Sequence, residues 1–104
     1  MTFYNRVILI GYLTEEPDTR YTPSGSQVTR FALQITPDRD AGDGTAPQII
    51  DVIALESDSS KESQPLSRGR RVLIEGKIHS RRWKTLEGQR RTKLEIIAER
   101  VYPL

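Results

Sequence analysis

The sequence lacks cysteine, holds one histidine (His79), and has no long apolar run. Without cysteine there is no disulfide, no thiolate nucleophile and no cysteine-ligated zinc or iron–sulfur site. A lone histidine leaves little material for a histidine-rich metal centre or a Ser-His-Asp triad, so we expect no metal, no cofactor and no enzyme activity. The early apolar stretch, residues 7–13, is far shorter than the ~20 residues of a membrane span. We therefore expect a cytoplasmic protein that makes no contact with membranes.

The chain is 104 residues long and has a mass of 11.9 kDa, which is enough for one domain and one modest core. We expect a single domain over residues 1–104. Hydrophobic residues make up 36% of the chain, and the seven glycines raise the apolar share to about 43%, slightly below the usual ~45–50%.

Charge is distributed unevenly along the chain, although the net charge is only +2. Residues 68–93 contain ten basic and two acidic residues, whereas residues 38–67 contain two basic and seven acidic ones. A basic block of this density repels itself unless something anionic meets it. A solvated basic face is the alternative, but the density favours a polyanion partner.

Apolar residues follow a two-residue period that is typical of β-strands. The expected strands cover residues 4–13, 28–36, 48–55, 71–85 and 90–102, and the inward positions include Phe31, Leu33, Val52, Val72, Ile74, Ile78, Leu94 and Ile96. Residues 15–26 and 37–47 carry proline, glycine and aspartate and are expected to be turns and loops, and residues 86–89 a hairpin turn. A short, poorly formed helix is expected over residues 56–68. In the last strand the inward apolar phase shifts from Leu94 and Ile96 to Ile97 and Val101, which indicates a β-bulge.

Five strands with one short helix between the third and fourth predict an all-β protein, a small five-stranded Greek-key barrel that is closed or partly open. Gly11 and Gly76 lie inside strands, where a barrel strand bends sharply. An SH3-like barrel or a two-sheet sandwich also fits this pattern. Val7–Ile10 is apolar at every position, which suggests that the core covers one face and a second subunit the other.

Several segments occur in the order and spacing of a known family. They are Asn5–Leu13, Pro17, Arg20–Gly25, Ile50–Ala54, Gly69–Gly76, Arg82-Trp83, Gly88–Arg91 and Glu95–Val101. Together they resemble the bacterial single-stranded DNA-binding proteins (SSB) over nearly the whole chain. The resemblance implies an OB-fold that binds single-stranded DNA in replication, recombination or repair at the nucleoid. It also implies a homotetramer, or in some cases a dimer.

The resemblance also shows departures. The family stacks bases on several aromatic residues, but only Trp83 is aromatic here; the other positions align with Arg39, Ile49 and Leu55. Family members carry a tail with an acidic tip, whereas this sequence stops at Leu104. We therefore expect no tail-mediated docking of replication enzymes. The alternative is a tail-less accessory OB-fold protein that resembles the primosomal replication protein N, or a scaffold for a protein or RNA with weak affinity for single-stranded DNA.

Non-specific binding of single strands needs cations for the phosphates and flat side chains for the bases. Alternation places Trp83 on one strand face with Arg81, and Arg82 and Lys84 on the other. Cations on the returning strand complete a hairpin with five or six positive charges and one indole. A core position for Trp83 is the alternative, which its charged neighbours disfavour. The candidate residues for binding single-stranded DNA, or RNA, are Trp83, Arg81, Arg82, Lys84, Arg90, Arg91, Lys93, Lys77, Arg39, Arg6, Ile49 and Leu55.

Overall fold

The computed structural model of the chain describes residues 2–36, 46–55 and 66–104. It contains six strands: β1 (Val7–Leu13), β2 (Asp18–Tyr21), β3 (Gln27–Gln34), β4 (Ile49–Leu55), β5 (Arg71–Lys84) and β6 (Arg90–Pro103). Most of the expected helix, and the loop that contains Arg39, lie outside the described residues. Within the described residues, no helix is long and apolar enough to cross a membrane.

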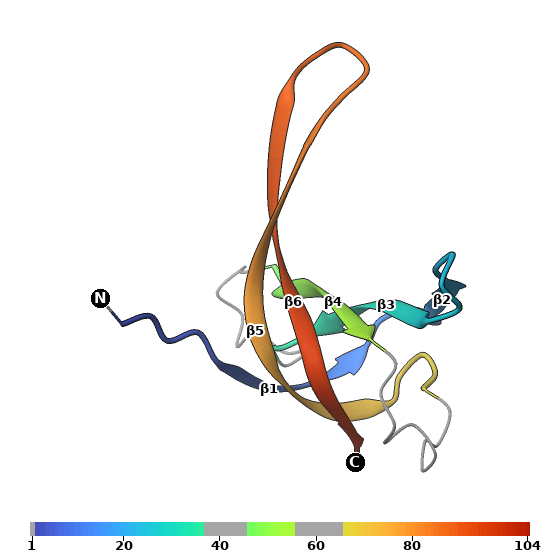
Figure 1. Cartoon of the computed structure of the whole chain (residues 1–104). Coiled ribbons are helices and arrows are strands. Elements are labelled where there is room, and N and C mark those ends of the chain that lie inside the picture. Colours follow the sequence, from blue (N-terminus) through green and yellow to red (C-terminus); the bar gives the residue numbers. More distant parts are fainter. Residues whose placement is uncertain (1, 37–45, 56–65) are drawn as a thin grey trace.

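The strands form one sheet in the order β1-β5-β6-β4-β3-β2, and an additional pairing of β1 with β3 closes it into a ring. The ring thus consists of the five strands expected from the sequence, with β4 and β6 paired in parallel and the other neighbours antiparallel. Figure 1 shows β5 and β6 running on from this barrel as a long hairpin.

The short strand β2 corrects the prediction that residues 15–26 form only turns. It pairs antiparallel with the start of β3, from Asp18 opposite Arg30 to Tyr21 opposite Gln27. All four of its residues are exposed, so it has no apolar alternation that a sequence pattern could reveal. Its position depends on backbone pairing with β3.

The first strand begins at Val7, three residues later than expected. Just before β1, the Asn5 side chain makes the two hydrogen bonds that the backbone of a paired strand residue would make. Its Nδ2 donates to the Ile78 carbonyl oxygen at 2.8 Å, and its Oδ1 accepts from the Ile78 amide at 2.9 Å. Asn5 therefore fastens the N-terminal segment to the place where the hairpin leaves the barrel.

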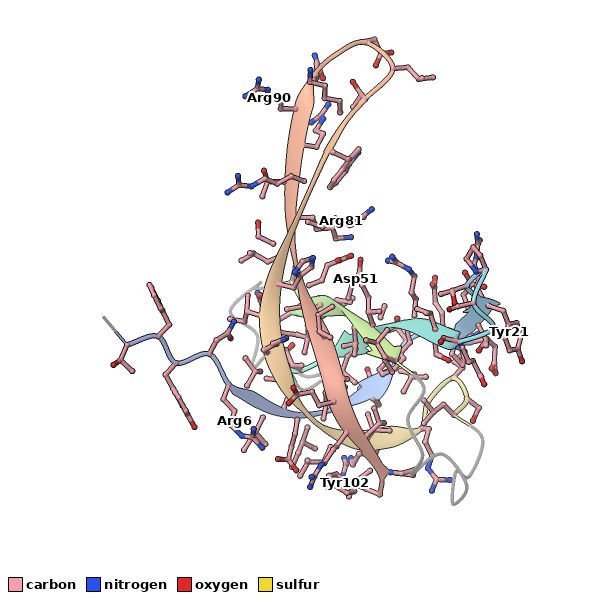
Figure 2. All side chains as sticks on the ribbon, in the orientation of Figure 1. Arg6, Tyr21, Asp51, Arg81, Arg90 and Tyr102 are labelled. Carbon is pink, nitrogen blue, oxygen red and sulfur yellow. The ribbon has the colours of Figure 1, made fainter. Side chains whose placement is uncertain are left out.

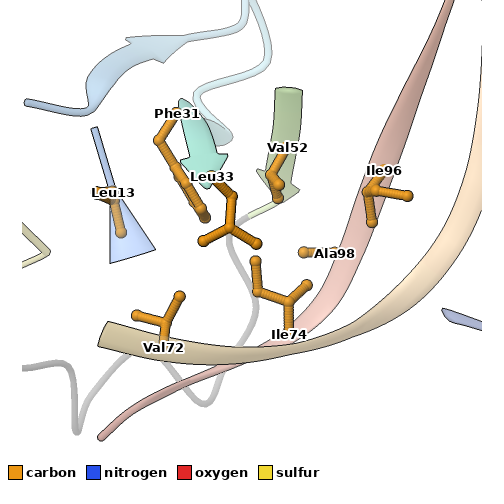
Figure 3. Close-up of a cluster of buried hydrophobic side chains, with 8 residues drawn as sticks. All are labelled: Leu13, Phe31, Leu33, Val52, Val72, Ile74, Ile96 and Ala98. Carbon is orange, nitrogen blue, oxygen red and sulfur yellow. The ribbon is translucent and has the colours of Figure 1, made fainter. Parts of the chain in front are cut away.

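The core lies inside the ring and draws side chains from β1, β3, β4, β5 and β6 (Figure 3). Its buried members are Leu13, Phe31, Leu33, Val52, Val72, Ile74, Ile96 and Ala98. The expected inward positions are confirmed except Ile97, which does not join the core, and Ile78 and Leu94, which are 46% and 58% exposed. Ile78 and Leu94 keep the inward phase of their strands, but they lie on the hairpin, where no opposite barrel wall covers them.

The expected bulge in the last strand is confirmed, but it lies at Glu99 and not directly before Ile97, whose side chain does not join the core. Glu75 pairs with Arg100 and Gly76 pairs with Ala98, so Glu99 has no opposite residue. Ala98 faces the core before the bulge, and Val101 packs against the core after it. The extra residue changes the phase and lets the long strands bend around the barrel.

Candidate nucleic-acid interface

The part of the β5–β6 hairpin beyond the barrel, residues 80–94, is called the arm below. Its register continues to the tip, where Lys84 pairs with Arg90. The turn is closed by hydrogen bonds from the Thr85 amide to the Gln89 carbonyl at 2.8 Å and from the Gly88 amide to the Thr85 carbonyl at 2.9 Å. Gly88 has a φ of 86°, which suits glycine. This fixed register decides which side chains share a face.

The arm has two faces with different chemistry. Arg81 lies opposite Lys93 and Trp83 lies opposite Arg91, and we call this side the indole face. Cross-strand partners point to the same side of a sheet, so Arg82 with Thr92 and Lys84 with Arg90 form the reverse face. The structure therefore divides the predicted cluster of cations between two sides of the ribbon.

Trp83 is exposed, with 39% of its surface accessible, so the alternative of a core tryptophan is excluded. The guanidinium carbon of Arg81 lies 4.5 Å from the centroid of the indole ring. This is a cation–π contact, and it covers one side of the ring. The other side is the part of Trp83 that can meet a flat ligand.

Carboxylates neutralise two cations of the indole face. The Nε of Arg81 lies 3.2 Å from the Glu95 Oε2, and the Lys93 ammonium forms an ion pair with Asp51 of β4. Figure 2 shows Arg81 at the base of the arm, with Asp51 close below it on the barrel. These internal pairs reduce the positive charge that the face presents to a ligand.

The other predicted cations differ in whether a side chain of the protein already binds them. Arg91 donates to the Gln89 Oε1 at 2.8 Å, and Arg6 pairs with Glu75 at 2.5 Å, away from the arm (Figure 2). In the part of the chain that the structure describes, no ion pair holds the exposed side chains of Lys77, Arg82, Lys84 and Arg90. The reverse face therefore carries much of the uncompensated charge.

Ile49 and Leu55 lie at the two ends of β4 and are 53% and 55% exposed. By alternation they share a strand face with Asp51, whose partner Lys93 belongs to the indole face. The indole face therefore continues from the arm onto the outside of β4. Both residues offer aliphatic contact there but no aromatic ring for stacking.

Sequence reasoning did not assign Arg30, Asp51 and Glu95 to this surface. Glu95 is completely buried, and the Arg30 Nη1 lies 3.5 Å from its Oε2. A signal was present, because alternation puts Glu95 on the strand face of Lys93 and Arg91. It was hidden by the apolar neighbours Leu94 and Ile96, which made this segment look like ordinary core strand.

The ring order β1-β3-β4-β6-β5 with a parallel β4–β6 pair defines a Greek-key barrel of the OB-fold class. A solved structure described as "Plasmodium falciparum SSB complex with ssDNA" shares this fold, with a TM-score of 0.83 and 24% sequence identity over 100% of this chain and 97% of that chain. The model of the single-strand binding protein family matches residues 4–104. The chain therefore belongs to the SSB family.

Curated relatives agree with this assignment. The single-stranded DNA-binding protein of Thermotoga maritima is 35% identical over 94% of this chain and 72% of the relative. Those of Treponema pallidum and Mycobacterium tuberculosis are each 34% identical over 97% and 93% of this chain. The matched region spans 58% and 62% of these two relatives.

Proposed function

We propose that this chain, as one domain over residues 1–104, binds single-stranded DNA without sequence preference and serves replication, recombination or repair. The observation that carries the proposal is the exposed Trp83, which lies beside Arg81 on a cationic arm of an SSB-family barrel. The names of the relatives support the same ligand. Such binding uses neither a cofactor nor a catalytic group.

In the proposed mode, a base stacks on the open side of Trp83 while cations contact the phosphates. Stacking contributes about 1–3 kcal/mol per base, and every base has a face that can stack. Phosphate contacts position the strand but read no sequence, so preference among bases is slight. The proposed contact residues are Trp83, Arg81, Arg82, Lys84, Arg90, Arg91, Lys93, Lys77, Arg39, Arg6, Ile49 and Leu55.

The decisive test is a titration of the intrinsic fluorescence with oligo-dT at several salt concentrations. Trp83 is the only tryptophan, so excitation at a wavelength that the four tyrosines do not absorb gives a signal from the arm alone. We expect quenching on binding, and an affinity that falls with salt by about 0.7 log units per log unit for each phosphate contact. Failure to bind oligo-dT at low salt would contradict the proposal, and tighter binding of oligo-U than of oligo-dT would reassign the ligand to RNA.

Asp51→Asn is expected to strengthen the binding of oligo-dT. The substitution releases Lys93 from its ion pair, and the freed ammonium can meet a phosphate. The slope of log affinity against log salt should steepen by about 0.7, and the affinity near physiological salt should rise by about two- to fivefold, in line with an exposed ion pair.

The control for this substitution is Glu99→Gln, which removes the same charge from the exposed bulge position. No ion pair in the described part of the chain involves Glu99. If both variants change the salt slope equally, net charge explains the effect and Lys93 makes no specific phosphate contact.

We also propose that copies of the chain assemble through β1 into a homotetramer, with the dimer as the smaller unit. Val7 and Leu9 pack against the core, whereas Ile8 and Ile10 are 60% and 54% exposed. Along residues 7–11, β1 pairs only with β5 in the described part, so its other edge can receive a second strand. Apolar side chains beside an open edge favour a second copy as the partner.

The double substitution Ile8→Lys/Ile10→Lys is expected to shift the protein toward the monomer in sedimentation at micromolar concentration. Two buried ammonium groups would oppose association, while an edge strand tolerates lysine in the monomer. Tyr21→Lys on β2 is the control, since it replaces another exposed apolar residue, 70% accessible, on a strand that does not pair with β1. Wild-type protein that sediments as a monomer would end the proposal.

A further inference from the structure

Among the described residues, Glu95 is the only charged side chain that is fully buried. Taking a carboxylate out of water is costly unless opposite charges compensate for it. Its Oε2 lies 3.2 Å from Arg81 and 3.5 Å from Arg30, whereas its Oε1 has no hydrogen-bond partner in the described part of the chain. Core packing alone does not require a charged side chain at this position. The role of Glu95 is therefore expected to lie in its contacts with Arg81 and Arg30.

Arg81 connects this buried carboxylate to the exposed indole. Its side chain is 40% exposed, and an arginine of that exposure would sample many rotamers if it were unrestrained. Two contacts restrain it: the ion pair with Glu95 and the guanidinium plane above Trp83, 4.5 Å from the ring centroid. Since Glu95 sits in the rigid barrel wall, it fixes one end of this chain of contacts.

We propose that Glu95 is a positioning residue for nucleic-acid binding. It holds Arg81 against one side of Trp83, so that the indole is oriented before the ligand arrives and offers a single open side to one base. The inference rests on the proposed function. In this arrangement Glu95 prepares the stacking platform through Arg81, and the platform accepts one base.

The first test needs no DNA. In free protein, Glu95→Gln should release Arg81 and open the second side of the indole, so acrylamide quenching of Trp83 should rise by up to about twofold. Asp51→Asn is the matched control, because it also removes a carboxylate from the indole face but does not touch Arg81; its quenching should equal that of wild type. Equal quenching in Glu95→Gln and wild type would overturn the proposal.

The second test measures oligo-dT affinity at high salt, where loss of a negative charge no longer strengthens binding through long-range attraction. Glu95→Gln should bind about two- to tenfold more weakly, the cost of ordering one long side chain on binding. Asp51→Asn should not weaken binding under these conditions. Increased acrylamide quenching with unchanged high-salt affinity would overturn the positioning role.

Two further outcomes separate a failure of the proposed function from a failure of the positioning role. If wild-type protein does not bind oligo-dT, the proposed function fails, while acrylamide quenching still decides whether Glu95 holds Arg81. If Glu95→Gln does not fold, Arg81→Ala replaces it, since it uncovers the indole directly and leaves Arg30 beside Glu95. Acrylamide quenching of Arg81→Ala equal to wild type would show that the guanidinium does not cover the ring, and the proposal would fall.

Discussion

Gly76→Ala is expected to destabilise the fold strongly. A Cβ at this position would lie 2.0 Å from the Ile97 carbonyl oxygen and 2.9 Å from the Ala98 Cα. Both are backbone atoms beside the bulge, so no side chain can turn away to relieve the clash. We expect a loss of roughly 3 kcal/mol or more, the upper end of the range for overpacking. Against a typical total stability of about 5–15 kcal/mol, this is a large fraction.

The measurement is thermal unfolding at one fixed protein concentration, because assembly would make the midpoint depend on concentration. A loss of this size lowers the midpoint by roughly 15 °C in a domain of about 100 residues. Gly25→Ala is the control: its φ is +91°, but no atom lies within 4 Å of the added Cβ. It should cost only about 1 kcal/mol, from backbone strain. Similar midpoints for the two variants would show that β5 and β6 are not in such close contact.

The barrel could be predicted from sequence because its strands alternate. Phe31 and Leu33, then Val72 and Ile74, occur at two-residue spacing, and these side chains form the observed core. The bulge was visible for the same reason, since an extra residue shifts the phase of a strand. The short strand β2 was not visible, because all of its residues are exposed and its pairing with β3 follows no apolar alternation.

The site was predictable only in part. Alternation along one strand was enough to place Trp83 with Arg81 and to put Arg82 on the other side of the arm. It could not reveal which cations are neutralised. Lys93 pairs with Asp51 of β4, and this pair depends on the closed ring, so local pattern does not contain it. Arg81 pairs with Glu95 across the hairpin, where the apolar neighbours of Glu95 hid the carboxylate.

Trp83→Ala is expected to have the largest single effect on the binding of single-stranded DNA. Ile49 and Leu55 have no aromatic ring, so Trp83 supplies the stacking that these positions cannot. Loss of one stacked base costs about 1–3 kcal/mol, which corresponds to about a 5- to 150-fold loss of affinity. The slope of log affinity against log salt should stay the same, because no phosphate contact is removed.

Because Trp83→Ala removes the fluorophore, its affinity is measured with a fluorescently labelled oligo-dT by anisotropy. The control is Leu86→Ala at the tip of the arm, where a fully exposed apolar side chain, 105% accessible, is removed from the same hairpin. It should leave the affinity nearly unchanged, since an aliphatic side chain does not stack a base. Arg82→Ala on the reverse face should show the opposite pattern to Trp83→Ala, a shallower salt slope by about 0.7. If Trp83→Ala binds like wild type while Arg82→Ala is impaired, binding is purely electrostatic and the ligand follows the reverse face of the arm instead of the indole.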